Sequence, residues 1–351
     1  MTKSPSRLAE MRFQMTALGA QLRWGANLQL ESVRKREGEL LVCGMGGSGI
    51  SGDFLQAVAA AEGRRTTVHK HYGLPGWAPS LRPSVVVVSY SGNTAETLSS
   101  WEEARKLGLQ VTAITSGGEL AEMAALAGDQ LVVIPGGYQP RSALGFGLSA
   151  LLRVAAQAGA ISDPQPSLEE AAHLADNLSG PKGEGIGFAS ELASAMGGRM
   201  VGVYGSVPLT QVAAYRWKTQ TNENAKRSAF WSVLPETTHN EIVGWDLPQG
   251  LARRRVGIVA LRDRDEHPGV SRRFEVLEKL TADRVTWVGE VWTQGFSPLG
   301  RLISLVAMGD LFSLELARNC GADPMAVDLI DRLKEEMDTS ADSAPEEPSG
   351  F

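Results

Sequence analysis

The chain has 351 residues, of which 43% are hydrophobic and 21% charged, and its formal net charge is -6. This length allows two domains of ordinary size, and the composition excludes disorder throughout the chain. The net negative charge argues against a surface that binds nucleic acid broadly, so we expect no nucleic-acid partner. The two cysteines, Cys43 and Cys320, lie far apart without a partner motif, which indicates neither a disulfide framework nor a cysteine-based metal site.

No stretch of the sequence predicts export or membrane insertion. Met1–Glu10 carries early charges and lacks the apolar run of a secretory signal. No window reaches the ~18 uncharged apolar residues that a membrane span needs. The best candidate, Leu302–Leu316, is interrupted by Asp310 and Glu315 and is typical of a buried helix. We therefore expect a cytoplasmic protein without a membrane partner.

The first part of the chain alternates short apolar strands with helices, after a helical lead that reaches about residue 38. The predicted strands are Glu39–Cys43, Thr66–His71, Val85–Val88, Val111–Thr115 and Leu131–Ile134. The predicted helices are Phe54–Ala61, Ala95–Leu107, Leu120–Ala127 and Leu144–Gln157. Because Val85–Val88 has no polar alternation, we expect it to be covered on both faces, as in a parallel sheet. Repeated β-α-β order predicts a doubly wound parallel sheet.

A second α/β pattern follows Pro164–Gly185, whose Pro, Gly, Asn and charged residues indicate a boundary. Its predicted strands are Met200–Tyr204, Arg254–Leu261 and Val285–Val291, and its predicted helices are Pro208–Thr221, Val270–Leu280, Pro298–Asn319 and Pro324–Lys334. We therefore expect two α/β domains, 1–160 including the lead and 161–337, each a doubly wound parallel sheet between helices (α/β/α). Residues 338–351, acidic and rich in Ser and Pro, are expected to form a disordered tail.

Hydroxyl residues crowd the turn that follows Val85–Val88. Ser89, Ser91 and Thr94 precede the predicted helix that starts at Ala95. The N-terminus of a helix offers unpaired N–H groups and a positive dipole end, while capping it takes only one hydroxyl. The turn therefore predicts an anion site, with phosphate as the expected anion. An ordinary N-capped turn is the alternative.

A glycine-rich turn follows the first predicted strand. Gly44, Gly46 and Gly49 have the G-x-G-x-x-G spacing of a dinucleotide-binding turn between strand and helix. The second predicted strand, however, ends in Lys-His-Tyr and lacks the acidic residue that would hold a ribose hydroxyl. The small residues Gly47 and Ser48 fit better a backbone that approaches a compact polar ligand beside the hydroxyl-rich turn. Dinucleotide binding is the weaker alternative.

Several motifs resemble those of a known family. The two turns, Gly44–Asp53 and Ser89–Thr97, resemble the sugar isomerase (SIS) domain. Five further segments resemble, more narrowly, the bifunctional phosphoglucose/phosphomannose isomerase family. They are Pro140–Gly145, Asn222–Lys226, Glu236–Glu241, Gly321–Pro324 and Leu333–Lys334. The resemblance spans about residues 40–336. It implies two SIS-type domains, a sugar-phosphate substrate, no cofactor, and a homodimer with shared active sites.

The resemblance implies an aldose–ketose isomerase that interconverts glucose 6-phosphate or mannose 6-phosphate with fructose 6-phosphate. Such an enzyme opens the sugar ring and moves a proton between C2 and C1 through an enediol. By resemblance Glu223, flanked by Asn222 and Asn224 as candidate orienting amides, is the catalytic base. His239, expected to reach the neighbouring subunit's site, and Lys334 assist ring opening. Arg141, in a loop after a strand, has a fixed charge suited to the enediolate oxygen.

Ordinary explanations compete with each assignment. A carboxylate, a lysine or an arginine at a helix end or in a loop is more often a solvated surface charge. His69 and His71 lie two apart on a predicted strand but have no apparent third ligand, so no metal site is predicted and metal-free proton transfer is expected. A non-catalytic sugar-phosphate sensor is the alternative function. Amidotransfer is disfavoured, because no glutaminase domain fits in the ~40 leading residues.

Overall fold

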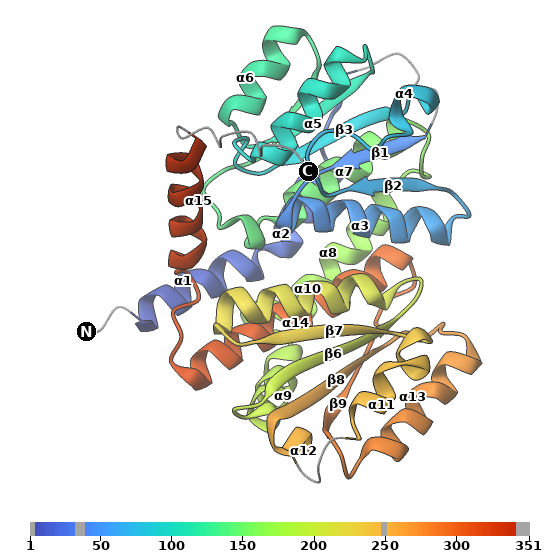
Figure 1. The fold of residues 1–351 in the computed structure, drawn as a ribbon, viewed down its shortest axis with the longest axis vertical. Helices are drawn as coiled ribbons and strands as arrows, with labels where there is room; N and C mark the ends of the chain where they lie inside the picture. The colour runs from blue at the N-terminus through green and yellow to red at the C-terminus, as the bar shows by residue number, and fades with distance from the viewer. Residues whose placement is uncertain (1–3, 32–38, 247–250, 342–351) are drawn as a thin grey trace, which may run out of the picture.

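A computed structural model of the chain describes residues 4–31, 39–246 and 251–341. It contains two fully parallel sheets, which occupy the upper and lower halves of Figure 1. The upper sheet has the order β2-β1-β3-β4-β5, with bounds β1 Leu40–Cys43, β2 Thr66–His69, β3 Ser84–Ser89, β4 Val111–Thr115 and β5 Gln130–Val133. The lower sheet has the order β7-β6-β8-β9, with bounds β6 Met200–Ser206, β7 Ala229–Leu234, β8 Val256–Arg262 and β9 Thr286–Trp292.

Helices connect and cover both sheets. The earlier helices are α1 Ser4–Thr16, α2 Leu18–Ala26, α3 Gly46–Ala61, α4 Ala78–Leu81, α5 Ala95–Lys106, α6 Gly118–Ala127 and α7 Leu144–Gln157, with the 3-10 turn η1 Pro140–Ser142. The later helices are α8 Gln165–Ser179, α9 Gly185–Met196, α10 Thr210–Ala225, α11 Glu241–Gly244, α12 Leu251–Arg255, α13 Pro268–Thr281, α14 Pro298–Cys320 and α15 Asp328–Ala341, with η2 Glu236–His239. The predicted fold class, two doubly wound parallel α/β domains, is confirmed.

Strand β3 is buried on both faces, as its unbroken run of valines predicts. Val86 and Val88 contribute to a core shared with α3 and α7, whereas Val85 and Val87 pack toward α5 and α6. Alternate residues of a strand point to opposite faces, so such a run needs helices on both sides. The strand order reverses around β1, which lies between β2 and β3. Ligands of open α/β sheets bind at the carboxyl ends of the strands at such a reversal.

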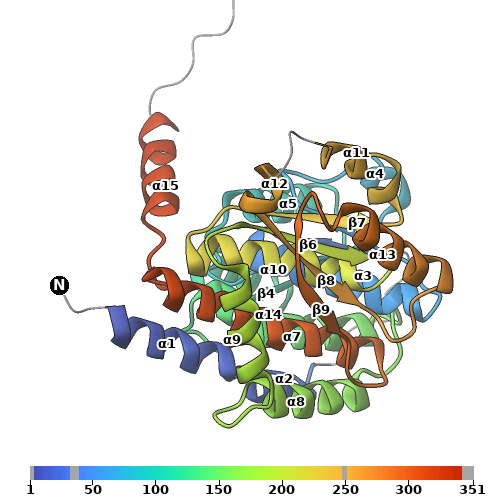
Figure 2. The same cartoon turned by 90° about the horizontal axis from the view of Figure 1, so that it is seen from below.

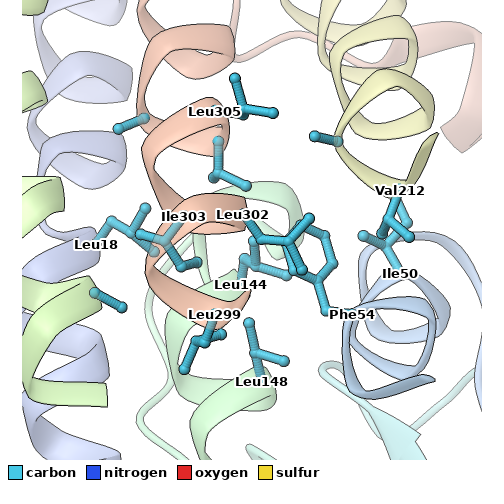
Figure 3. Close-up of a cluster of buried hydrophobic side chains, with 14 of the residues drawn as sticks. Leu18, Ile50, Phe54, Leu144, Leu148, Val212, Leu299, Leu302, Ile303 and Leu305 are labelled. Carbon is cyan, nitrogen blue, oxygen red and sulfur yellow. The ribbon is translucent and has the colours of Figure 1, made fainter. Parts of the chain in front are cut away.

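The two halves share one hydrophobic core around α14. Figure 3 shows Leu302 and its neighbours on α14 surrounded by side chains from four other helices, α2, α3, α7 and α10. Gly309 of α14 lies against the ring of Trp217 on α10, and a Cβ there would come within 2.3 Å of the indole nitrogen. This close approach explains the glycine in mid-helix. None of the helices in the described parts of the chain has the length and apolar character to cross a membrane.

The structure corrects three expected boundaries. Helix α3 begins at Gly46 instead of Phe54, because the glycine-rich turn is itself the first turns of the helix. Helix α10 runs to Ala225, so Glu223 lies in its last turn and not after it. The last helix is Asp328–Ala341 instead of Pro324–Lys334, so it includes four residues of the expected tail. Residues 342–351 of that tail lie outside the described residues.

Two segments gave misleading patterns. Helix α8 occupies most of Pro164–Gly185, where a boundary was expected, because its proline stands in the first turn and its buried residues recur at helical spacing. Strand β7, Ala229–Leu234, was not predicted. It is an edge strand and only partly buried, so it lacks the apolar run of the central strands. In addition, β2 ends at His69, which leaves His71 outside the strand.

Candidate active site

Two helix N-termini meet at the carboxyl ends of β1 and β3. These strands are adjacent, with Cys43 paired to Val87, so the helices that follow them begin side by side. Helix α3 starts at Gly46 and α5 starts after Thr94, and neither N-terminus has a side-chain cap. Their first N–H groups therefore point to the end of the sheet without a capping acceptor. Together with the positive dipole ends, they form an environment suited to an anion.

Hydrogen bonds tie the two turns together. Ser48 Oγ accepts from the backbone N–H of Tyr90 at 3.2 Å, which links the start of α3 to the turn after β3. Within that turn Ser89 Oγ donates to Thr94 Oγ1 at 3.1 Å. Ser91 Oγ accepts from the backbone N–H of Asn93 at 3.3 Å. The predicted hydroxyl residues therefore lie in one neighbourhood.

Gly92 has a backbone conformation that only glycine adopts easily at this place. Its φ is +74°, and a Cβ would lie 1.9 Å from the carbonyl oxygen of Gly117. The turn after β3 thus packs directly on the turn after β4, and its shape depends on the missing side chain.

Arg141 and Glu223 form an ion pair close to the start of α3. Arg141 Nη1 donates to Glu223 Oε2 at 3.4 Å; the Arg141 side chain is 5% exposed and that of Glu223 is 33% exposed. Burial lowers the pKa of Arg141, and Glu223 opposes this effect. Gly47, at the start of α3, lies against η1, with its missing Cβ position 3.4 Å from the carbonyl oxygen of Pro140. The pair therefore lies next to the N-terminus of α3.

Four contacts besides the Glu223 ion pair hold Arg141. Its Nε donates to Asn224 Oδ1 at 2.8 Å, and its Nη2 donates to the carbonyl oxygen of Pro324. Its Nη1 also reaches Gln139 Oε1 at 3.4 Å. Its own carbonyl oxygen accepts from Nη2 of the buried Arg216 at 3.0 Å. Both the backbone and the guanidinium are thus fixed, and the Nη1 edge faces the carboxylate of Glu223.

The N-terminal helices clamp the loop that carries Arg141. Gln14 of α1 accepts from the N–H of Gln139 and from the hydroxyl of Ser142, both at 2.8 Å. Gln21 of α2 donates to the carbonyl of Ser142 at 2.7 Å and accepts from the N–H of Gly145 at 2.9 Å. Sequence reasoning missed this role of the lead, since no local pattern connects residues more than 120 positions apart.

The structure separates the roles of the two asparagines that flank Glu223. Asn222 Nδ2 donates to the carbonyl of Arg227 at 2.8 Å, and Asn224 contacts Arg141. In the described parts of the chain, neither amide forms a hydrogen bond with the Glu223 carboxylate. The expectation that these amides orient the carboxylate is therefore wrong. Lys226, which sequence reasoning did not assign, donates to the carbonyl of Glu223. Burial and the charge of Arg141 lower the pKa of Lys226.

His239 and Lys334 are not brought to this ion pair within one chain. His239 ends η2, after the edge strand β7, and is exposed. It makes no hydrogen bond or ion pair with another described residue. Lys334 lies exposed on α15, which projects from the body of the molecule in Figure 2. The same helix exposes the apolar side chains of Leu329 and Leu333.

The two parallel α/β domains and the paired helix N-termini place the protein in the class of SIS-domain proteins. Residues 187–337 match the family model of the bacterial phospho-glucose isomerase C-terminal SIS domain. The crystal structure of tagatose-6-phosphate ketose/aldose isomerase from Escherichia coli has the same fold. Its TM-score is 0.65 at 15% sequence identity, over 92% of this chain and 95% of that chain.

Two curated relatives narrow the assignment. The bifunctional phosphoglucose/phosphomannose isomerase of Caldicellulosiruptor bescii is 33% identical over 318 residues, which cover 89% of this chain and 93% of the relative. The protein of the same name from Aquifex aeolicus is 37% identical over 301 residues, 85% of this chain and 90% of the relative. The chain belongs to the bifunctional phosphoglucose/phosphomannose isomerase family.

Proposed function

We propose that this protein is an aldose–ketose isomerase that interconverts glucose 6-phosphate and mannose 6-phosphate with fructose 6-phosphate. The observation that carries the proposal is the half-buried Glu223 carboxylate, paired with buried Arg141 next to the uncapped N-terminus of α3. The family relatives bear the name of this activity. They lend no support to the alternative of a non-catalytic sensor.

In the proposed reaction, the substrate phosphate binds at the N-termini of α3 and α5. Ser48, Ser89, Ser91 and Thr94 supply N–H and hydroxyl groups there, and Gly47 brings the backbone close to the sugar. Glu223 removes the proton from C2 of the open-chain aldose and returns it to C1, and the proton on O2 moves toward O1 in the same conversion. The Arg141 guanidinium stabilises the negative oxygen of the enediolate between these steps. Atoms and charge balance, because the reaction only relocates protons.

The proposed function is tested by a coupled assay on both aldose 6-phosphates, carried out with and without a chelator. We expect turnover of both substrates to fructose 6-phosphate, unaffected by the chelator. Tight calorimetric binding of hexose phosphates without any turnover would contradict the proposal and favour a sensor.

Replacing Thr94 by valine is expected to weaken phosphate binding, since the variant keeps the shape of the side chain but loses its hydroxyl. A hydrogen bond to a charged group contributes about 1.5–3 kcal/mol, so KM should rise about 10-fold or more with little change in kcat. Thr286→Val, at the start of β9 in the other sheet, is the matched control. An unchanged KM in the Thr94 variant would exclude this residue from the phosphate site.

The proposal includes a homodimer in which His239 of one chain serves ring opening in the site of the other. Mixing Glu223→Gln chains with His239→Ala chains, each inactive alone, should then restore activity. Random pairing makes half of the dimers mixed, and each mixed dimer has one intact site, so about one quarter of wild-type activity is expected. The absence of any recovery, with mixed dimers verified by mass spectrometry, would assign His239 to its own chain's site.

Lys334 is proposed to assist ring opening, and α15 must move or meet a second chain to bring it to the site.

Residues 1–160 and 161–337 are proposed as the two domains, since the connection from α7 to α8 falls between them. A cytoplasmic location is proposed because the relatives are named as enzymes of sugar-phosphate metabolism.

A further inference from the structure

The side chain of Asn224 is completely buried between Arg141 and α14. Its Oδ1 accepts from Arg141 Nε at 2.8 Å, and its Nδ2 donates to Ser313 Oγ at 2.9 Å. Ser313 Oγ in turn donates to the carbonyl oxygen of Asp310 at 2.8 Å. The serine proton is therefore committed to that carbonyl, and toward Asn224 the hydroxyl can only accept. This chain of bonds turns the amide oxygen of Asn224 toward the arginine.

We propose that Asn224, oriented by Ser313, is the positioning residue for Arg141 in the isomerase reaction. The inference rests on the proposed function and adds to it a residue that does not touch the substrate. Asn224 occupies the Nε of the guanidinium and the Pro324 carbonyl occupies Nη2. Within the described parts of the chain, the Nη1 edge makes only long contacts of 3.4 Å, to Glu223 and Gln139. That edge is left to bind the developing oxyanion beside the catalytic base.

A neutral acceptor at this place preserves the charge of the arginine. An aspartate at 224 would also accept from Nε, but it would add a buried negative charge next to Arg141. The guanidinium would then be neutralised by a protein carboxylate and would stabilise the enediolate less. Asn224 fixes the direction of the guanidinium without this competition. Because Glu223 is its neighbour in the last turn of α10, one helical turn carries the base and fixes the orientation of the arginine.

A double-mutant cycle between Asn224 and Arg141 tests the positioning role. We expect Asn224→Ala to lower kcat by about 100-fold, with KM within about 3-fold of wild type, since a misplacement of 1 Å has effects of this size. Arg141→Lys should lower kcat at least as much. The double variant should be no slower than Arg141→Lys alone, because an absent guanidinium needs no positioning. Ser313→Ala should lower kcat in the same direction by a smaller factor.

Asn222→Ala is the matched control, because Asn222 flanks Glu223 on the other side and its amide donates to the carbonyl of Arg227 instead of to Arg141. Its kcat should stay within about 3-fold of wild type. Additive losses in the double variant, or an equal loss in Asn222→Ala, would show a merely structural role and overturn the proposal. Full activity of Arg141→Lys would instead contradict the role of Arg141 in the proposed function.

A crystal structure of the Asn224→Ala variant gives a readout that does not depend on activity. The guanidinium of Arg141 should leave its wild-type place while the helix backbone around 224 is unchanged. A guanidinium that keeps its place in this variant would overturn the positioning role even if the enzyme is slow.

Discussion

Glu223→Gln is expected to lower kcat by about 10²- to 10⁴-fold, the range that a general base contributes, because an amide cannot take up the C2 proton. The variant keeps the size of the side chain and leaves the N-termini of α3 and α5 untouched. Binding of glucose 6-phosphate should therefore stay within a few-fold of wild type when it is measured by calorimetry. This combination, lost turnover with retained binding, distinguishes a base from a binding residue.

Glu278→Gln, an exposed glutamate on α13, is the control for the general effect of removing one negative charge. It should leave both kcat and binding unchanged. Wild-type turnover in Glu223→Gln would rule out the proposed proton transfer, whatever the other variants show. Loss of binding together with turnover would instead indicate that Glu223 holds the sugar.

Asp310→Ala is expected to cost the largest share of stability of any single change in the site. The carboxylate of Asp310 accepts hydrogen bonds from Arg216 and Gln220. Asp310 is 5% exposed and Arg216 is 2% exposed. Burial raises the pKa of Asp310, and Arg216 opposes this effect. Without the carboxylate the charge of Arg216 is left buried and unpaired, so the free energy of unfolding should fall by about 3–5 kcal/mol. Chemical denaturation measures the loss.

Replacing the whole pair separates stability from function. In Arg216→Met/Asp310→Leu both charges leave the interior together, so much of the stability lost in Asp310→Ala should return. Activity should nevertheless be low in this double variant, because the carbonyl oxygen of Arg141 loses its donor from Arg216. If Asp310→Ala denatures like the wild type, the ion pair makes no net contribution and this account is wrong.

The class of fold followed from short stretches that report their own environment. The valines of β3 predicted a strand that is buried on both faces, and the hydroxyl-rich turn predicted a helix N-terminus that is open to an anion. Local pattern failed where burial is partial or composition misleads. Strand β7 is half exposed at an edge, α8 has a proline in its first turn, and α3 begins with glycines. These cases were decided by packing against other elements and not by intrinsic preference.

The site was predictable in part. Motif resemblance singled out Arg141 and Glu223, which the fold brings into contact although they are 82 positions apart. It also singled out His239 and Lys334, which one chain does not bring to that pair; their roles stay predictions. The clamp formed by Gln14 had no sequence signal, because glutamine is common on surfaces. Asn224 was singled out as an amide for Glu223, and its actual partner, Arg141, was not predicted.

By itself, the sequence determined the two parallel sheets, the turns at the ends of β1 and β3, and the residue types available for proton transfer. Only the tertiary structure decided how the arginine is held, by partners 75, 83 and 183 positions away on α10 and after α14. The physical reason is that hydrophobic periodicity encodes which side of an element is buried, whereas a buried hydrogen bond depends on which distant element is packed there.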